Sequence, residues 1–329
     1  MTGGVLVTGG LGFIGSAYIR LLSDRADIVN VDAHTYAADP RRIPDEIRTV
    51  RLDVTDAGLR DVMERGRPRV VVHFAAETHV TRSESDQATF FRSNVDGTRA
   101  IFDAARGCGV EVVVHVSTDE VYGPALDHPF VEDEKEPGEG RATSAYARSK
   151  ALADDLAGSY ANDMRVVVVR PTNCFGPWQH PEKAIPRWAT RALSGERLPV
   201  WGDGGYVRDW MFVDDVCAAI QLLVENEGAS GAYNIGPGGE PLTNLEIARR
   251  VAEAAERGPE DVYLTDYDRP QHDRRYSVDA GRMRALGWTP EVGVADGITR
   301  TIEWYTANRE WWEPLRDRAP IAEGSAWKS

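Results

Sequence analysis

A tyrosine and a lysine four positions apart are the first pair of residues in this sequence that could carry out chemistry. Tyr146 and Lys150 lie in a stretch with helical periodicity, so their side chains project from the same face of the expected helix. A lysine ammonium beside a phenol lowers the pKa of the phenol. We therefore expect Tyr146 to remove a proton from a sugar or alcohol hydroxyl as hydride leaves the same carbon.

Two adjacent carboxylates follow an expected strand, in the segment Val116-Ser-Thr-Asp-Glu-Val-Tyr-Gly123. Dehydration of a hexose needs such a pair. Once C4 is oxidised to a ketone, a base removes the acidic C5 proton while an acid protonates the C6 hydroxyl, and hydride then returns to C6. One carboxyl must be neutral and the other ionised. An epimerase needs no such pair, so Asp119 and Glu120 favour dehydration; the alternative is that both are solvated loop carboxylates.

A glycine-rich turn connects the first expected strand to the first expected helix. The spacing of Gly9, Gly12 and Gly15 lets the backbone approach a pyrophosphate at the helix N-terminus, where free N–H groups and the helix dipole favour anions. Asp32 ends the next strand, where a carboxylate can accept hydrogen bonds from a ribose and would repel a 2′-phosphate. The sequence therefore predicts NAD rather than NADP. Asp53, after the third strand, is expected near the adenine, unless it caps the following helix.

Short apolar runs alternate with stretches of helical periodicity along the first half of the chain. Runs that are apolar throughout indicate strands buried on both faces, and their separation by helices indicates a parallel sheet with right-handed crossovers. The expected strands span residues 5–8, 28–32, 49–52, 70–74, 110–116, 165–169 and 233–235. The expected helices span residues 14–23, 86–106, 144–160, 242–255 and 295–308.

The character of the chain changes after about residue 171, where Pro, Gly and Trp punctuate short elements. We therefore predict an α/β fold, with a Rossmann-type doubly wound parallel sheet and a smaller, partly interleaved α/β substrate domain. The predicted NAD-binding Rossmann domain comprises residues 1–173 and 205–236. The predicted substrate domain comprises residues 174–204 and 237–329.

The chain has 329 residues and a formal net charge of −14, from 38 basic and 52 acidic side chains. This balance argues against a nucleic-acid surface or a basic membrane face, and no apolar run reaches the ~20 residues that span a bilayer. The three cysteines and the scattered histidines lack metal-ligand spacing, so we expect no metal site. With no signal-peptide pattern, these features predict a cytoplasmic protein. Only four basic residues are Lys, which suggests that Lys150 needs an amine.

These motifs resemble those of the extended short-chain dehydrogenase/reductase superfamily over about the first 175 residues. The match rests on the turn 9–15, Ser117-Thr118, Tyr146 and Lys150. Segment 116–123 narrows the resemblance to the nucleotide-sugar 4,6-dehydratases, above all the dTDP-glucose 4,6-dehydratases. Further matching segments, which extend it to about Pro314, are 32–37, 73–80, 181–186, 207–210 and 269–276. The resemblance implies oxidation of dTDP-glucose at C4, loss of water across C5 and C6, and return of hydride to C6.

The resemblance also implies a role for each catalytic residue. Tyr146 would be the base for the C4 hydroxyl, and Lys150 its electrostatic partner and a ribose ligand. Thr118 would hold the C4 oxygen, while Asp119 acts as the acid and Glu120 as the base of the elimination. NAD would stay tightly bound, because it is regenerated in each turnover. The residues expected to bind it are Gly9, Gly12, Phe13, Ile14, Gly15, Asp32, Thr35, Asp53, Val54, Phe74, Ala75, Ala76, Thr78, Ser117, Tyr146 and Lys150.

A nucleoside diphosphate is anionic, so an acidic protein must neutralise it locally. The resemblance places Lys183, Arg208 and Arg269 at the diphosphate, and Arg is suited to bidentate phosphate contacts. For any single basic residue the alternative is a solvated surface charge, and for Trp201, expected to stack on the base, it is ordinary packing. The remaining expected substrate contacts are Asn173, Asn244 and His272. The aromatic residues at 304, 305, 311 and 312 are expected to pack between helices.

Three residues depart from those usual in the resembling family: Thr81, Cys174 and Tyr206. They leave the base and the sugar open, so that a UDP-, GDP- or CDP-hexose is an alternative substrate. A 4-epimerase or a decarboxylase is a less favoured alternative, because decarboxylases usually carry Ser-Glu where this chain has Asp119-Glu120. A catalytically silent NAD-binding regulator is a third. The resemblance further suggests a homodimer joined by the helices 86–106 and 144–160.

Overall fold

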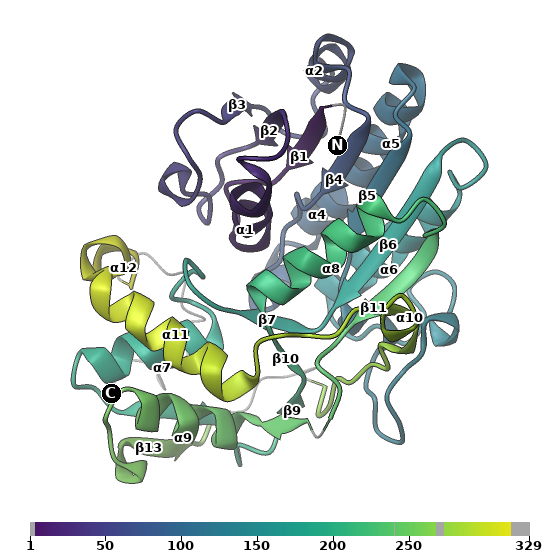
Figure 1. Cartoon of the computed structure of the whole chain (residues 1–329). Coiled ribbons are helices and arrows are strands. Elements are labelled where there is room, and N and C mark those ends of the chain that lie inside the picture. The colour runs from purple at the N-terminus through teal and green to yellow at the C-terminus, as the bar shows by residue number, and fades with distance from the viewer. Residues whose placement is uncertain (1–3, 240, 268–272, 317–329) are drawn as a thin grey trace.

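A seven-stranded parallel sheet forms the centre of the molecule (Figure 1). It is seen in a computed structural model that describes residues 4–239, 241–267 and 273–316. The strand order is β11-β6-β5-β4-β1-β2-β3, so the order reverses beside β1, as it does in doubly wound folds. The predicted fold class is therefore confirmed. The strands are β1 (Val5–Thr8), β2 (Ile28–Asp32), β3 (Arg48–Arg51), β4 (Val70–His73), β5 (Val112–Val116), β6 (Arg165–Pro171) and β11 (Gly231–Ile235).

Side chains of each central strand alternate between two apolar cores, one on each face of the sheet. Val5 and Val7 of β1 belong to one core and Leu6 belongs to the other. This burial on both faces explains why the strands are apolar throughout. The helices α1 (Phe13–Leu22) and α8 (Val213–Glu225) cover the first face, whereas α2 (Gly58–Gly66), α5 (Gly97–Cys108) and α6 (Ala145–Gly158) cover the second. Of these helices, α8 was not expected from the sequence, and α2 is the helix expected to follow Asp53.

The helix expected over residues 86–106 is interrupted by one π-helical turn. It consists of α4 (Gln87–Phe91), the turn Arg92–Asp96 and then α5. At this turn the side chain of Asn94 bonds to the backbone N–H and carbonyl of Glu77, at 2.9 and 3.1 Å, and donates to Ser149 Oγ at 2.8 Å. Such turns often occur at functional sites. Here the turn joins the loop after β4 to α6, which carries Tyr146 and Lys150.

The second region is built from short elements that pair across long stretches of sequence. The pairs are β7 (Asn173–Phe175) with β10 (Trp210–Phe212), β9 (Val207–Arg208) with β12 (Leu242–Thr243), and β8 (Leu198–Trp201) with β13 (Val262–Thr265). Its helices are α7 (Ala184–Leu193), α9 (Asn244–Ala254), α11 (Val294–Ala307) and α12 (Arg309–Arg316). These elements enclose a separate core around Phe175, Trp188, Ile247 and Ile302. The exact domain boundaries stay a prediction.

Several shorter helical segments complete the described chain. They are α3 (Val80–Ser85), α10 (Gly281–Ala285) and the 3-10 turns Pro40–Arg42, Asp119–Tyr122, Glu132–Glu134 and Pro259–Asp261. The turn Asp119–Tyr122 directly follows β5 and carries both of the predicted catalytic carboxylates. The end of β5 therefore fixes where these carboxylates lie.

The C-terminal helix α12 returns to the loop that follows β2. Trp311 Nε1 donates to Asp39 Oδ2 at 2.8 Å, and the buried guanidinium of Arg42 lies 5.3 Å from the Trp311 ring. Arg42 also donates to the carbonyls of Leu11 at 2.8 Å and Trp178 at 3.1 Å. One buried arginine thus connects the glycine-rich turn, the second region and the C-terminal helix. As expected, the aromatic residues Trp304, Tyr305, Trp311 and Trp312 pack together, with Trp178 among them.

Candidate active site

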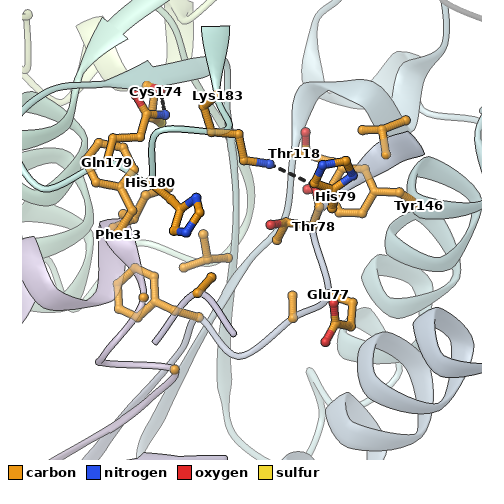
Figure 2. Close-up of a pocket in the computed structure, with 18 of the residues that line it drawn as sticks. Phe13, Glu77, Thr78, His79, Thr118, Tyr146, Cys174, Gln179, His180 and Lys183 are labelled. Atoms are coloured by element: carbon orange, nitrogen blue, oxygen red, sulfur yellow. Dashed lines mark hydrogen bonds between the residues drawn. The ribbon is translucent and has the colours of Figure 1, made fainter. Parts of the chain in front are cut away.

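One cavity of about 530 Å³ lies at the carboxyl ends of the central strands and is also lined by the second region. Figure 1 shows the central sheet and the elements of the second region, and Figure 2 shows part of the lining of the cavity. Every predicted site residue that the structure describes lines this cavity. Arg269 and His272 lie outside the described residues. The lining residues that were predicted are Gly9, Gly12, Phe13, Ile14, Gly15, Asp32, Thr35, Asp53, Val54, Phe74, Ala75, Ala76, Thr78, Ser117, Thr118, Asp119, Glu120, Tyr146, Lys150, Asn173, Lys183, Trp201, Arg208 and Asn244.

The glycine-rich turn contains four glycines, and two of the three that were predicted to bind the cofactor, Gly9 and Gly15, are too closely packed to accept a side chain. Gly9 has a φ of +71°, and a Cβ there would lie 2.6 Å from the backbone nitrogen of Ala75. A Cβ on Gly15 would lie 2.4 Å from the carbonyl oxygen of Gly9. Gly12, which caps the N-terminus of α1, lines the cavity, and its Cβ would meet only Gly9 O at 3.1 Å. The backbone at Gly12 is thus open to a phosphate-bearing ligand.

Asp32 holds the glycine-rich turn as well as lining the cavity. Its Oδ2 accepts from the Leu11 N–H at 2.9 Å and its Oδ1 from the His34 N–H at 2.8 Å. The carboxylate keeps lone pairs for a ribose hydroxyl, because each oxygen can accept more than one hydrogen bond. The polar lining therefore fits the adenosine end of a dinucleotide.

Asp53 does not cap the following helix, which was its alternative role. The residue that caps α2 is Ala57, whereas Asp53 Oδ1 accepts from the N–H and hydroxyl of Thr55 at 2.9 and 2.8 Å. Burial raises the pKa of the Asp53 carboxyl, but these hydrogen bonds and the charge of Arg92 lower it further than burial raises it. An ionised acceptor is therefore held at the cavity edge.

Tyr146 and Lys150 lie one helical turn apart on α6, and both are buried. Lys150 Nζ donates to the Val116 carbonyl at 2.8 Å and lies 3.4 Å from His115 Nε2. Burial lowers the pKa of Lys150 to about 8, and the nearby Asp154 carboxylate opposes this change. The ammonium thus bonds to the end of β5, and Lys150 also lines the cavity.

In the protein alone, Lys150 does not bring the pKa of Tyr146 below its usual value. Burial raises the pKa of Tyr146 above its usual value, and the charge of Glu120 adds to this effect. A hydrogen bond with Thr118 opposes it only in part. The physical reason is the removal of water from the buried phenol, while the Lys150 ammonium donates to the Val116 carbonyl on β5. Tyr146 is therefore a neutral phenol until further positive charge enters the cavity.

Asp119 is held in the neutral form that an acid requires. Burial raises the pKa of its carboxyl well above the usual value, and the charges of Glu120 and Asp209 add to this effect. Its Oδ1 accepts from the Thr118 hydroxyl at 3.2 Å, while the Glu120 N–H donates to Thr118 Oγ1 at 3.3 Å. Glu120 is the less buried of the two carboxylates. The structure thus brings an acid, a second carboxylate and a hydroxyl to one wall.

Arg208 is buried at the other end of the cavity. Its guanidinium donates to the Asp273 carbonyl at 2.8 Å and to its neighbour Val207 O at 2.6 Å. It also lies 4.4 Å from the centre of the Tyr276 ring. Arg208 therefore brings a positive charge to the cavity, and its hydrogen bonds also hold the segment that begins at Asp273.

The other predicted substrate contacts approach the cavity from different elements. Lys183 precedes α7 and donates to the Thr78 carbonyl at 3.4 Å, a hydrogen bond drawn as a dashed line in Figure 2. Asn173 Oδ1 and Asn244 Oδ1 are buried and have no hydrogen-bond partner among the described residues. Trp201 packs edge-on against Tyr267, with ring centres 5.0 Å apart. The two amide oxygens are thus available to a polar ligand.

Two of the three departures, Thr81 and Cys174, line the cavity. The Cys174 thiol donates to the Thr172 carbonyl at 3.3 Å, and burial raises its pKa. Tyr206 is buried instead outside the lining, with its ring beside Arg208 and Arg274. Thr81 and Cys174 are therefore in a position to contact a ligand, whereas Tyr206 lies outside the lining.

A group of polar residues that the sequence did not single out links the two halves of the cavity. Glu182 is nearly buried and accepts from Tyr36 Oη at 2.9 Å, while its other oxygen lies 3.6 Å from His79 Nε2 and 3.9 Å from His180 Nδ1. Burial raises the pKa of Glu182, but the charges of Lys183 and both histidines lower it further. These residues lie inside or beside the matching segments 32–37, 73–80 and 181–186, which was the signal that could have found them.

Two features of the described residues bear on other functions. No helix in this part of the chain is long and apolar enough to cross a membrane. Among the same residues, no group of three or more His, Cys, Asp or Glu side chains could hold a metal ion.

Comparison with known proteins gives a consistent result. Residues 5–236 match the NAD dependent epimerase/dehydratase family. A dTDP-glucose 4,6-dehydratase of Streptomyces niveus is 40% identical over 98% of this chain and 99% of its own length. The low-salt glycan biosynthesis protein Agl12 of Haloferax volcanii is 41% identical over 93% of this chain and 99% of its own.

A solved structure agrees in fold as well as in sequence. The dTDP-glucose 4,6-dehydratase DesIV of Streptomyces venezuelae, crystallised with NAD, superposes with a TM-score of 0.87 at 41% identity, covering 94% of this chain and 99% of that one. The glycine-rich turn, the Tyr146–Lys150 pair and the Asp119–Glu120 turn thus lie in a fold shared with such enzymes over nearly their whole length. The chain belongs to the NAD dependent epimerase/dehydratase family, among the dTDP-glucose 4,6-dehydratases.

Proposed function

We propose that this protein converts dTDP-glucose into dTDP-4-keto-6-deoxyglucose with NAD as a resident cofactor. The observation that carries the proposal is the placement of Asp119 and Glu120, beside Thr118 and Tyr146, on the wall of one cavity. Hydride transfer alone needs no such pair, whereas loss of water needs both an acid and a base. The extensive identity with named dehydratases supports the same reaction.

The lining of the cavity fits NAD. The backbone of Gly12 is open to the pyrophosphate, and Asp32 offers carboxylate oxygens to the adenosine ribose. The buried hydroxyl of Ser117, which has no hydrogen-bond partner among the described residues, faces the same cavity. When bound, NAD supplies reversible hydride transfer and is unchanged at the end of each turnover.

In the first step Tyr146 takes the proton of the sugar C4 hydroxyl as C4 is oxidised. A buried phenol resists ionisation, so this step needs positive charge nearby. Lys150, from the same helix, supplies one such charge and would hold the cofactor ribose. The Thr118 hydroxyl, which interacts with Tyr146, holds the C4 oxygen in line with the phenol.

In the second step the two carboxylates remove water. Glu120 takes the proton from C5, which the C4 ketone has made acidic. Asp119 gives its proton to the C6 hydroxyl, which leaves as water. The alkene left between C5 and C6 would then take back at C6 the hydride removed from C4, and at C5 the proton held by Glu120. The raised pKa of Asp119 keeps that proton in place near neutral pH, as the acid role requires.

The substrate nucleotide would be bound at the opposite end of the cavity. Arg208, Lys183 and Arg269 would neutralise its diphosphate, with Asn173, Asn244 and His272 binding phosphate, ribose or sugar oxygens. Trp201 would stack on the base. The buried amide oxygens of Asn173 and Asn244 support this assignment, since they line the cavity and need a donor.

The test is to incubate the protein with dTDP-glucose and look by mass spectrometry for a product that has lost one water. Glu120→Gln separates the two steps. This variant should still oxidise C4, seen as the near-ultraviolet absorbance of reduced cofactor, yet release no dehydrated sugar. Full activity of Glu120→Gln would refute the role of Glu120, and no turnover of any nucleoside-diphosphate hexose by the parent would refute the function.

The nucleotide and hexose are a separate question, because Thr81 and Cys174 line the cavity where the family usually has other residues. A panel of dTDP-, UDP-, GDP- and CDP-glucose at equal concentration would resolve it. We expect the highest kcat/KM for dTDP-glucose. Loss of water from another nucleotide sugar at higher kcat/KM would change the substrate but keep the reaction, whereas inversion at C4 would indicate an epimerase.

We further propose that the protein is a cytoplasmic homodimer joined through the helical segment 87–108 and α6. These helices pack against each other on one face of the sheet, which makes a continuous helical surface available for a second copy. The three cysteines are free thiols, which is typical of a reducing compartment. Light scattering after gel filtration should give twice the mass of the chain, and a monomeric mass would contradict the dimer.

A further inference from the structure

A chain of buried polar side chains leads away from Lys150, and its members other than Lys150 have no role in the reaction described above. It joins Lys150, Asp154, Arg170 and Tyr122, and the last three do not line the cavity. Buried charges are costly unless they are paired, so such a chain within an apolar core calls for a physical reason.

One end of this chain lies next to Lys150. Asp154 follows Lys150 by one turn on α6, and the exposed fraction of its residue surface is only 4%. Its Oδ1 lies 3.7 Å from His115 Nε2, which itself lies 3.4 Å from Lys150 Nζ. This Oδ1 has no hydrogen-bond partner among the described residues.

The centre of the chain is an ion pair between α6 and β6. Arg170 Nε donates to Asp154 Oδ2 at 2.8 Å, and both side chains are almost inaccessible to solvent. Hydrogen bonds between opposite charges in such a dry environment are strong and directional. The pair therefore fixes the position of the Asp154 carboxylate relative to Lys150.

The other end of the chain reaches the turn that carries the catalytic carboxylates. Arg170 Nη1 donates to Tyr122 Oη at 2.7 Å and to the Glu132 carbonyl at 3.0 Å. Tyr122 Oη donates in turn to Asn234 Oδ1 at 2.7 Å. Because Tyr122 ends the 3-10 turn that begins at Asp119, holding its side chain also holds the turn.

Among the ionisable groups around Lys150, Asp154 is the one that favours its protonated form. His73 on β4 and His115 on β5 are both neutral, since burial lowers the pKa of His73 to about 3 and that of His115 well below its usual value. Tyr146 is a neutral phenol, and Arg170 on β6 is positive. Asp154 is the group whose charge raises the pKa of Lys150.

We propose that the Asp154–Arg170 pair is a positioning device for both catalytic steps: Asp154 keeps Lys150 protonated, and Arg170 holds the Asp119–Tyr122 turn through Tyr122. One buried ion pair thus positions both Lys150 on α6 and the Asp119–Tyr122 turn after β5. The effect on turnover rests on the proposed function, whereas the effect on Lys150 can be measured without substrate.

The low lysine content makes that measurement direct. The sequence has only four lysines, so protein grown with lysine labelled at Cε gives few NMR signals, and Lys150→Met assigns the one that belongs to Lys150. In the purified protein the Lys150 signal should titrate near pH 8. In Asp154→Asn its midpoint should fall by about one pH unit or more, as expected on loss of a nearby opposite charge.

The chain offers a matched control at the adjacent position. Asp155 pairs with Lys135 at 2.7 Å on the exposed side of the same helix. Asp155→Asn should alter the Lys135 signal and leave the Lys150 midpoint in place. An unchanged Lys150 midpoint in Asp154→Asn would overturn the role of Asp154. If Asp154→Asn does not fold, the double variant Asp154→Asn/Arg170→Gln removes both charges and must still lower the midpoint.

The second half of the proposal is tested with Tyr122→Phe. This variant keeps the ion pair but removes the phenol oxygen that Arg170 and Asn234 share. It should leave the Lys150 midpoint unchanged while slowing loss of water relative to C4 oxidation about tenfold in single turnovers. Equal slowing of both steps would overturn the link to the carboxylate turn. If the protein does not act on dTDP-glucose, the NMR result for Asp154 still stands by itself.

Discussion

The two ends of the cavity are built in different ways. The end at the glycine-rich turn consists largely of backbone, and its shape depends on glycines whose neighbours leave no room for a Cβ. The end at Arg208 consists of side chains from β7, β8, β9, α7 and α9, brought together by two-stranded sheets. We call the end at the glycine-rich turn the cofactor end and the end at Arg208 the substrate end. Binding at the cofactor end depends on the absence of side chains, whereas binding at the substrate end depends on charge and hydrogen bonds. We therefore expect substitutions at the two ends to have different effects.

Gly9→Ala should have the largest effect and should act only on the cofactor end. The new Cβ would lie 2.6 Å from the Ala75 nitrogen at a φ of +71°, so the turn must move. We expect near-complete loss of NAD from the purified protein and a lower melting temperature, with backbone strain alone costing about 1–3 kcal/mol. The measurements are NAD content after gel filtration and thermal unfolding.

Gly109→Ala is the matched control for this substitution. Its φ of +69° is almost the same, but its Cβ would have no neighbour within 4 Å. It should lower stability by only ~1 kcal/mol and keep NAD in place. Equal NAD content in the two variants would contradict the steric account of the cofactor end.

Asp119→Asn tests the catalytic wall, which lies between the two ends of the cavity. Loss of the acid should lower kcat about 10²–10⁴-fold without loss of NAD. Because the pKa of Asp119 is raised in the folded protein, ionising it there is unfavourable. The parent should therefore lose stability relative to Asp119→Asn as the pH rises from the unfolded pKa of ~4 through the raised folded value. Urea unfolding between pH 5 and 8 measures this difference.

An exposed aspartate gives the opposite expectation and serves as a control. Hydrogen bonds from Arg274 lower the pKa of Asp203 to about 2. Its contribution to stability is thus fully present above its unfolded pKa and is lost only as the pH falls toward 2. Asp203→Asn should show no trend relative to the parent between pH 5 and 8. A parallel trend in both variants would mean that Asp119 is not the group responsible.

Arg208→Lys should weaken the substrate end and leave the cofactor end intact. Lysine keeps the charge but cannot reproduce the hydrogen bonds to Asp273 O and Val207 O together with contact on Tyr276. We expect KM for the nucleotide sugar to rise about tenfold to a hundredfold, with NAD content unchanged. Arg274→Lys, at an exposed ion pair with Asp203, should change KM less than about twofold. Loss of NAD from Arg208→Lys would contradict the separation of the two ends.

Tyr36→Phe should have the smallest effect, because it removes one exposed hydrogen bond between the two ends. Tyr36 Oη donates to Glu182 Oε1 at 2.9 Å and so links the loop after β2 to the loop before α7. Exchange of bound NAD for labelled NAD should accelerate about two- to tenfold, the equivalent of one ordinary hydrogen bond. Glu182→Gln keeps an acceptor for the phenol and should exchange more slowly than Tyr36→Phe. No acceleration in Tyr36→Phe would show that this bridge does not retain the cofactor.

Local sequence was enough to predict the cofactor end but only part of the substrate end. The glycine spacing, the buried strands and the Tyr146–Lys150 pair are each contained in a few residues, and their elements were found close to their expected bounds. Helix α8, which was missed, packs against α1 and has most of its residues buried. The raised pKa of Tyr146 and the Glu182 group were missed because they depend on burial and on contacts between distant segments.

The contact of Trp311 with Asp39 has a consequence for how the protein is made. These residues are 272 positions apart, so a ribosome adding ~5–20 residues per second needs roughly 15–55 s between them. During that interval most of the central sheet can form, but Arg42, in the loop after β2, lacks its contact with the ring of Trp311. The loop after β2, which contains Asp39 and Arg42, therefore reaches its final packing only late in synthesis. A chain that ends before Trp311 should have this loop accessible to proteases and should lose NAD easily.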